Sequence, residues 1–199
     1  MKNIIVSGST GLVGSRILEL LREDFNFIPL LVNQVDITKS KEVDEFIDSK
    51  DFDLFLHLAA YTNVNGAELE KDIAYKVNVE GTKNVSSAVL KKNKEFIYMS
   101  TDFVFSGDDK EKSYTEDDKP NPSGVYASSK YEGEKIVNKK AMITRISFPY
   151  RARFEAKKDF VSSIKSMLER GQEIHAVTDS IITPTFIDDI AFSIKYLIN

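Results

Sequence analysis

Gly8-Ser9-Thr10-Gly11-Leu12-Val13-Gly14 follows the apolar run Asn3–Ser7 directly and opens a segment of helical periodicity. In such a strand–loop–helix setting, the first glycine permits a tight turn and the second lets the backbone approach a pyrophosphate. The third allows the helix to pack closely on the strand, and the start of the helix adds free N–H groups and a positive dipole. The stretch therefore predicts a dinucleotide-binding loop formed by Gly8, Thr10, Gly11, Leu12, Val13 and Gly14.

Apolar runs alternate with helical periodicity along the chain. Helices are predicted at about Leu12–Arg22, after an N-cap at Thr38 or Ser40, and along Ala74–Lys92. Strands that alternate with helices through short loops imply right-handed crossovers, so we expect an α/β fold of the Rossmann type, doubly wound around a parallel sheet. The predicted strands are Asn3–Ser7, Phe27–Val32, Leu54–Leu58, Phe96–Ser100 and Met142–Ile146.

Two residues within these elements stand out. Pro29 is unexpected in a central strand, because proline lacks the N–H that a sheet uses. Gly81 lies on the apolar stripe of the predicted Ala74–Lys92 helix and indicates a close contact there.

Composition narrows the class of protein. The 199 residues, 42% hydrophobic and 29% charged, suit one globular domain. A net charge of −4 without a basic cluster argues against nucleic acid or an anionic membrane as partner. The absence of cysteine excludes disulfides and thiolate chemistry, and with two histidines we expect no metal site. No signal-like start and no apolar run near 18 residues occur, so a soluble cytoplasmic protein is expected.

Two tyrosine–lysine pairs have the spacing i, i+4, Tyr126/Lys130 and Tyr131/Lys135. Hydride chemistry at a carbinol or ketone needs a proton donor or acceptor, and a phenol of pKa about 10 is tuned by a nearby ammonium and hydroxyl. Thr101, at the end of the fourth predicted strand, is the candidate hydroxyl. Five residues rotate a helix by about 140°, so only one tyrosine faces the site. Tyr126 is predicted to be catalytic because it is nearest the strand edge.

The second predicted strand ends Leu31-Val32-Asn33, with no acid at its tip. An acid at this position usually binds the ribose of NAD and would repel a 2′-phosphate. Without it, the sequence leaves the cofactor open as NADPH or NADH.

Six motifs occur in the order found in the extended short-chain dehydrogenases, and the subfamily that the chain most resembles is the dTDP-4-dehydrorhamnose reductases. They are GSTGLVG (Gly8–Gly14), VDIT (Val35–Thr38), HLAAYTNVNGAE (His57–Glu68), VNVEGTKNV (Val77–Val85), STDFVFSG (Ser100–Gly107) and YASSKYEGEK (Tyr126–Lys135). The resemblance implies reduction of a 4-keto-6-deoxy nucleotide sugar by NADPH or NADH, as in dTDP-rhamnose biosynthesis.

The resemblance also implies roles for individual residues. Tyr126 would donate a proton to the sugar C4 oxygen, Lys130 would bind the nicotinamide ribose and lower the pKa of the tyrosine, and Thr101 would assist. The adenine would lie against Asp36 and Ile37, and the cofactor channel would be lined by Ala60, Tyr61, Thr62 and Met99. The sugar nucleotide would meet Thr101, Asp102 and Phe148, where the family usually has tryptophan at the last position.

RISFPY (Arg145–Tyr150) and TPTFIDDIA (Thr183–Ala191) resemble later segments of the family more weakly. Family members continue for several tens of residues beyond the second segment, whereas this sequence ends at Asn199. We therefore expect residues 1–199 to form a single dinucleotide-binding domain, with substrate-binding elements from about 145 and a reduced or missing C-terminal substrate domain. The sequence leaves open whether this is a natural short form or whether later residues are missing.

Three further possibilities follow from the resemblance. An epimerase or dehydratase of the same superfamily would retain a tightly bound NAD+. A non-catalytic, cofactor-binding regulatory subunit is the other alternative, because the methionine adenosyltransferase β subunits resemble these reductases. The apolar face of the Tyr126 helix would support a homodimer, as in this superfamily.

Overall fold

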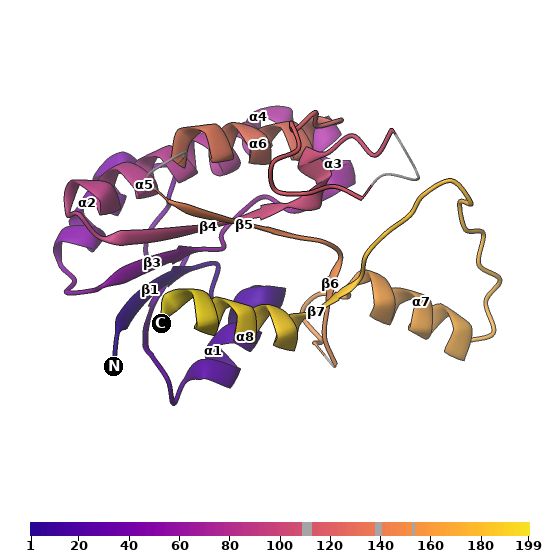
Figure 1. The fold of residues 1–199 in the computed structure, drawn as a ribbon, viewed down its shortest axis with the longest axis horizontal. Helices are drawn as coiled ribbons and strands as arrows, with labels where there is room; N and C mark the ends of the chain where they lie inside the picture. Colours follow the sequence, from indigo (N-terminus) through magenta and orange to yellow (C-terminus); the bar gives the residue numbers. More distant parts are fainter. Residues whose placement is uncertain (109–112, 138–140, 153) are drawn as a thin grey trace.

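A computed structural model describes residues 1–108, 113–137, 141–152 and 154–199 (Figure 1). Its centre is a five-stranded parallel sheet in the order β2-β1-β3-β4-β5. The direction of winding reverses between β1 and β3, which confirms the doubly wound parallel sheet. The strands are β1 (Asn3–Ser7), β2 (Asn26–Leu30), β3 (Leu54–His57), β4 (Glu95–Thr101) and β5 (Met142–Ile146).

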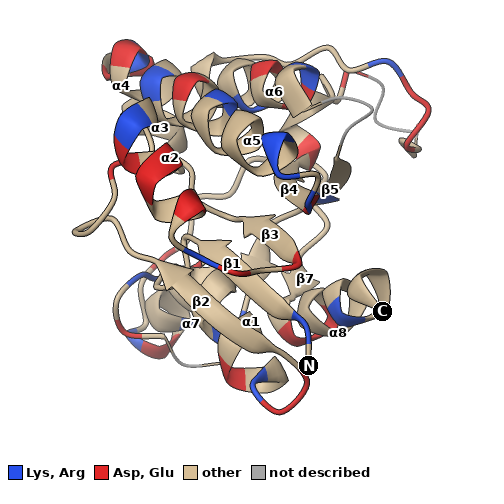
Figure 2. Ribbon diagram, turned by 90° about the vertical axis from the view of Figure 1, so that its left-hand side faces the viewer, with Lys and Arg blue, Asp and Glu red and all other residues tan. Residues whose placement is uncertain are grey.

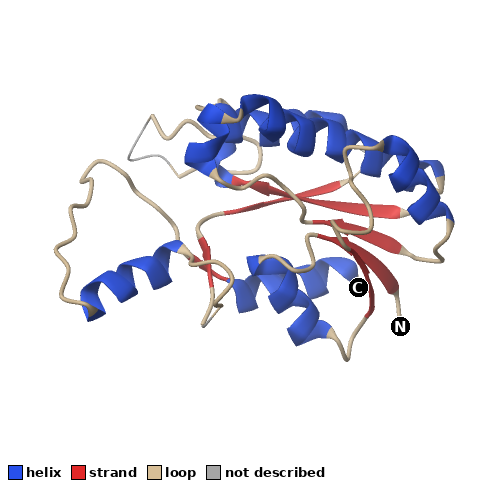
Figure 3. Ribbon diagram, turned by 180° about the vertical axis from the view of Figure 1, so that it is seen from behind, coloured by secondary structure: helices blue, strands red, loops and turns tan. Residues whose placement is uncertain are grey.

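Helices cover both faces of the sheet (Figures 1 and 3). One face carries α2 (Ser40–Asp48), α3 (Val64–Leu69), α4 (Lys71–Tyr75), the π-helix η1 (Lys76–Gly81), α5 (Thr82–Lys91) and α6 (Val125–Val137). The other carries α1 (Leu12–Leu21) and α8 (Ile187–Ile198). Beyond the carboxyl edge lie the 3₁₀ turn η2 (Asp102–Val104), the parallel pair β6 (Pro149–Tyr150) and β7 (Thr185–Phe186), and α7 (Phe160–Glu169). None of these helices is long and apolar enough to cross a membrane, within the described ranges.

The sheet is buried on both faces because its strands are almost continuously apolar. Alternate side chains enter two separate cores. The core under α1 and α8 contains Ile4, Val6, Leu56, Ile97 and Met99 from the strands, with Ile17, Leu21, Ile190 and Ile194 from the helices. The core under α2, α5 and α6 contains Ile5, Phe55, Phe96 and Tyr98, with Val43, Ile47, Val85, Val89 and Val137.

Pro29 is explained by topology. Its strand β2 is the edge strand of the sheet, where a residue without an N–H is tolerated. The close contact expected at Gly81 is also confirmed, because a Cβ there would lie 2.8 Å from the Cδ1 atom of Ile37.

Two expectations about helices were wrong. The N-cap of α2 is Lys39, because the Thr38 hydroxyl donates to Asp36 instead, 2.8 Å away. The predicted Ala74–Lys92 helix is divided by the π-helix η1. This wide turn carries the buried Asn78, whose side chain bonds to groups on two other segments, and such turns are often found near functional sites.

The C-terminal helix α8 returns to the edge at which the chain begins (Figure 2). The amine of Lys2 donates to the carbonyl of Ile198 at 2.6 Å, and the Arg16 guanidinium on α1 makes two 2.7 Å bonds to the Asp188 carboxylate on α8. Beneath these polar contacts, the apolar side of α8 closes the core that it shares with α1.

Replacing Ile194 by alanine should therefore lower the free energy of unfolding by about 2–4 kcal/mol, since the side chain is 2% exposed and its loss leaves a cavity. Tyr196, on the same helix but 83% exposed, is the control, and Tyr196→Ala should change stability by no more than about 0.5 kcal/mol. Urea denaturation measures both. Equal losses would show that α8 does not close the core.

Candidate functional site

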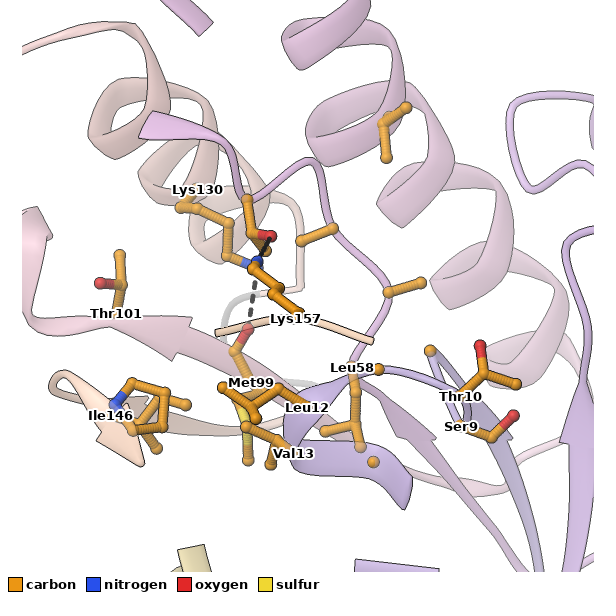
Figure 4. A pocket seen from close by; sticks show the side chains of 18 of the residues that line it. Ser9, Thr10, Leu12, Val13, Leu58, Met99, Thr101, Lys130, Ile146 and Lys157 are labelled. Atoms are coloured by element: carbon orange, nitrogen blue, oxygen red, sulfur yellow. Dashed lines mark hydrogen bonds between the residues drawn. The ribbon is translucent and has the colours of Figure 1, made fainter. Parts of the chain in front are cut away.

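A cavity of about 700 Å³ opens at the carboxyl edge of the sheet, over the point where the strand order reverses. Figure 4 shows Met99, Thr101 and Lys130 toward one end of it and Ser9 and Thr10 toward the other. Every predicted site residue apart from Tyr61 lines this cavity: Gly8, Thr10, Gly11, Leu12, Val13, Gly14, Asp36, Ile37, Ala60, Thr62, Met99, Thr101, Asp102, Tyr126, Lys130 and Phe148.

The glycine turn packs backbone directly against backbone. Gly8 has a φ of +70°, and a Cβ there would lie 2.7 Å from the amide nitrogen of Ala59. A Cβ on Gly14 would lie 2.3 Å from the carbonyl oxygen of Gly8. Gly11 is the N-cap of α1, and no described side chain caps this helix. The first N–H groups of α1 therefore remain available to an anion at the cavity.

The wall expected to hold adenine is built around Asp36. Its carboxylate accepts the N–H and the hydroxyl of Thr38 at 2.9 and 2.8 Å, and these bonds hold the pKa of Asp36 below its ordinary value. The neighbouring Ile37 packs against the helix containing Gly81. The Asp36 carboxylate at this wall is thus already hydrogen-bonded to Thr38.

Lys130, on α6, is buried at the opposite end. Its amine donates to the carbonyl of Met99 at 2.8 Å and lies 4.1 Å from the centre of the Tyr98 ring. Burial lowers the pKa of Lys130 to about 7, and the charge of Glu134, one turn along α6, opposes the shift. Glu134 is itself held by two bonds from Arg145, at 3.0 and 2.8 Å.

Tyr126 enters the cavity one turn before Lys130. Burial raises its pKa, the Thr101 hydroxyl bonded to it lowers it, and the charge of Asp102 raises it. Burial is the largest of these effects, and the role expected of Lys130 in lowering the pKa of Tyr126 stays a prediction.

The neighbours of Tyr126 are fixed by polar and aromatic contacts. The Thr101 hydroxyl donates to Asp102 at 3.2 Å, and the other oxygen of Asp102 accepts the Ser147 hydroxyl at 2.6 Å. Phe148 has a φ of +38°, a strained conformation that is typical of functional sites. Its ring belongs to an aromatic row with centroid spacings of 6.0, 5.6 and 5.4 Å, formed in order by Tyr126, Phe103, Phe148 and Phe160.

Tyr61 does not enter the cavity. Its hydroxyl donates to Glu70, and its backbone N–H donates to Asn78 at 2.8 Å. The amide of Asn78 also donates to Ser129 on α6 at 2.9 Å. Asn78 thereby ties the Ala60–Thr62 wall to the helix that carries Tyr126 and Lys130.

The second tyrosine–lysine pair also lies outside the cavity, with the Lys135 amine 4.6 Å from the centre of the Tyr131 ring. His57 is buried between hydroxyls, with ring nitrogens 2.7 Å from Ser7 and 3.1 Å from Thr82. Burial lowers the pKa of His57 to about 3, so it remains neutral.

The cavity is also lined by residues that were not predicted from the sequence, among them Ser9, Ser100, Phe103, Lys157 and Phe160. Ser9, Ser100 and Phe103 lie inside the glycine-turn and STDFVFSG motifs, so the predicted residues beside them could have indicated that they line the site. Lys157, whose amine donates to Thr62 at 2.8 Å, and Phe160 lie in a segment without a motif.

The expected dinucleotide fits these walls. The start of α1 is uncapped, and two buried hydroxyls that line the cavity, those of Ser9 and Ser100, have no partner among the described residues. These groups suit a ligand with phosphates and ribose hydroxyls.

Comparisons with known proteins agree on one family. The family model described as RmlD substrate binding domain matches residues 1–199. The dTDP-4-dehydrorhamnose reductase of Aggregatibacter actinomycetemcomitans is 33% identical over 196 residues, covering 96% of this chain and 65% of that protein. A probable low-salt glycan biosynthesis reductase of Haloferax volcanii is 34% identical and covers 94% of this chain and 67% of its own length. This chain thus spans 65% of the length of the first of these relatives.

Solved structures give the same result. The dTDP-4-dehydrorhamnose reductase of Bacillus anthracis, in complex with NADP, superposes with a TM-score of 0.91 at 33% identity, over 99% of this chain and 70% of that one. The UDP-glucose 4-epimerase of Thermotoga maritima gives 0.83 at 21% identity, over 96% of this chain and 71% of that one, and shares the fold.

Replacing Gly14 by alanine should lower the free energy of unfolding by about 3 kcal/mol, because the added methyl meets backbone atoms that cannot move aside. Gly11→Ala is the matched control. Its methyl meets only the Gly8 carbonyl oxygen at 3.2 Å, so the loss should be about 1 kcal/mol or less. Thermal unfolding measures both, and a Gly14→Ala protein as stable as Gly11→Ala would contradict the packing described.

Replacing Lys130 by methionine should stabilise the protein most at low pH. The folded protein releases the Lys130 proton near pH 7, whereas the unfolded chain keeps it up to about 10.5. The unfolded chain binds more protons between these pH values, so the free energy of unfolding of the wild type rises with pH there. The difference in unfolding free energy between wild type and Lys130→Met therefore narrows by roughly 1 kcal/mol per pH unit.

Denaturant unfolding at several pH values measures this gap. Lys41→Met, which removes a lysine 89% exposed on α2, should follow the wild-type profile throughout. A constant gap between wild type and Lys130→Met would show that the buried amine does not titrate in this window.

Proposed function

This chain belongs to the family described as RmlD substrate binding domain, and from that premise we propose that it catalyses NADPH-dependent reduction of a 4-keto-6-deoxy nucleotide sugar. One observation carries the proposal: Tyr126, Thr101 and Lys130 line the same cavity as the glycine turn. The names of the Aggregatibacter and Bacillus relatives support a dTDP-4-dehydrorhamnose reductase, the activity of dTDP-rhamnose biosynthesis.

NADPH is the proposed cofactor, and when bound it supplies a hydride. Two observations support it over NADH: the Bacillus relative was crystallised with NADP, and Leu31-Val32-Asn33 places no acid at the end of β2. The Gly8–Gly14 turn and the start of α1 would hold the diphosphate, and the Asp36 wall the adenine. Met99 and Lys130 would border the nicotinamide half.

The proposed role of Tyr126 is to protonate the substrate oxygen. Its raised pKa keeps the phenol protonated near neutral pH, as a proton donor requires. The reaction balances when the keto carbon gains the hydride and its oxygen gains the phenol proton, which gives a secondary alcohol. Thr101 would hydrogen-bond that oxygen, and Lys130 would bind ribose hydroxyls.

Substrate contacts are proposed for Thr101, Asp102 and Phe148. Beyond β5, the β6–α7 segment borders the same cavity at Pro149 and Phe160, which supports substrate-binding elements from about residue 145 within a single 1–199 domain. The aromatic row ending at Phe160 would replace the tryptophan surface usual in the family. A cytoplasmic location and a homodimer through α6 stay predictions.

Tyr126→Phe should lower turnover by at least about 100-fold while NADPH still binds, because the proton donor is lost and the ring keeps its packing. Tyr131→Phe is the matched control and should be nearly silent, since Tyr131 lies outside the cavity. The assay follows loss of NADPH absorbance with dTDP-4-dehydrorhamnose, and fluorescence titration follows NADPH binding. An inactive Tyr131→Phe protein with normal NADPH binding would overturn the assignment of the tyrosine.

The same assay on the wild-type protein separates the alternatives. Bound NADPH without oxidation removes the reductase assignment and favours a regulatory subunit. A purified protein that carries stoichiometric NAD+ favours an epimerase or dehydratase.

A further inference from the structure

An arginine outside the cavity joins the β6–α7 side of the cavity to the helix that begins at the glycine turn. Arg151 directly follows β6, and its guanidinium donates to the Ser15 hydroxyl at 3.1 Å and to the Glu19 carboxylate at 3.0 Å, both on α1. Figure 1 shows β6 and β7 between the layer of α1 and α8 and the separate helix α7. Arg151 therefore bridges two parts of the fold that lie 136 residues apart in the chain.

The backbone of the same residue holds the start of α7. Its N–H donates to one carboxylate oxygen of Asp159 at 3.3 Å, and the other oxygen accepts the N–H of Ser162 at 2.7 Å, which makes Asp159 the N-cap of α7. Asp159 is buried and lines the cavity together with Phe160. Arg151 thus contacts both α1 and the end of α7 that borders the cavity.

Burial decides how much weight such polar contacts have. An ion pair between exposed side chains contributes little, whereas partly buried pairs that form a network contribute more. The Arg151 side chain is 11% exposed, and those of Arg16 and Asp188 are 22% and 17% exposed. Glu19, at 51%, accepts from both arginines. Charges of alternating sign therefore join β6, α1 and the start of α8.

The parts that Arg151 joins carry different halves of the proposed site. The start of α1 would hold the diphosphate of the dinucleotide, whereas Phe148 and Phe160 border the half proposed for the nucleotide sugar, with ring centroids 5.4 Å apart. Phe148 precedes Arg151 by three residues. A shift of β6 against α1 would displace these rings, while the glycine turn, which packs on the end of β3, would stay in place.

We propose that Arg151 is a positioning residue for the nucleotide sugar: its bonds to Ser15 and Glu19 hold β6 and the start of α7 at the spacing from α1 that this substrate requires. The inference rests on the proposed function, which supplies the substrate. Arg151 is not among the described residues that line the cavity, so it acts through Phe148 and Phe160 and not by contact with the ligand.

Removing the guanidinium should weaken binding of the sugar nucleotide alone. Arg151→Met keeps an apolar stem and loses both bonds to α1, so the Kd of dTDP for the protein saturated with NADP+ should rise about tenfold. The Kd of NADP+ should stay within about twofold of the wild-type value. In the turnover assay, the KM for dTDP-4-dehydrorhamnose should rise about tenfold and kcat should change by about twofold or less. Isothermal titration measures the two Kd values.

Two further variants separate positioning from stability. Lys195→Met is the matched control, because it removes an ion pair of 2.6 Å to Asp24 that joins α8 to the turn after α1 and does not involve β6 or α7. It should leave dTDP binding unchanged. Arg151→Lys keeps the charge but lacks the planar fork that serves two acceptors, so its Kd for dTDP should lie between those of wild type and Arg151→Met.

Wild-type dTDP affinity in Arg151→Met, or an equal loss in Lys195→Met, would overturn the inference and leave the proposed function standing. NADP+ binding weakened as much as dTDP binding would also overturn it, since that result indicates general disruption. No turnover by the wild type would overturn the proposed function, and the dTDP titrations would still decide the inference. A wild-type protein that does not bind dTDP would overturn both.

Discussion

The contact of Gly8 with the end of β3 is the constraint on which the rest of the site depends. Its left-handed backbone and missing side chain bring the first turn within touching distance of Ala59, and Gly14 then rests on the Gly8 carbonyl. Because α1 starts this close to the sheet, its free N–H groups point over the place where the strand order reverses. The cavity opens at this place, and the glycine turn forms one of its walls.

The other end of the cavity buries two ionisable groups, which costs stability. Lys130 is buried and loses much of its tendency to be charged, and Tyr126 is buried and holds its proton more tightly. The surrounding structure fixes both groups. Glu134, one turn along α6 from the lysine, is held by Arg145, and Asn78 ties α6 to the Ala60–Thr62 wall. Rigid support of this kind suits a proton donor that must meet one substrate oxygen.

Local patterns in the sequence predicted the five strands of the central sheet, the glycine turn and Tyr126 rather than Tyr131 as the tyrosine at the strand edge, because periodicity and adjacency to a strand edge are local properties. The π-helix at Asn78 was not predictable in this way, since it depends on bonds to Tyr61 and Ser129, 17 and 51 residues away. The burial that raises the pKa of Tyr126 was likewise not predictable, because burial is a tertiary property. Phe160 lies in a segment whose sequence carries no recognised motif.

We propose that this cavity brings a nicotinamide and a keto sugar together for direct hydride transfer. The most direct test supplies NADPH labelled with deuterium on the reactive face of the nicotinamide, together with dTDP-4-dehydrorhamnose, and examines the product by mass spectrometry and NMR. We expect one deuterium at C4 of the sugar and release of NADP+. A product without deuterium, or an unchanged sugar in the presence of bound NADPH, would contradict it.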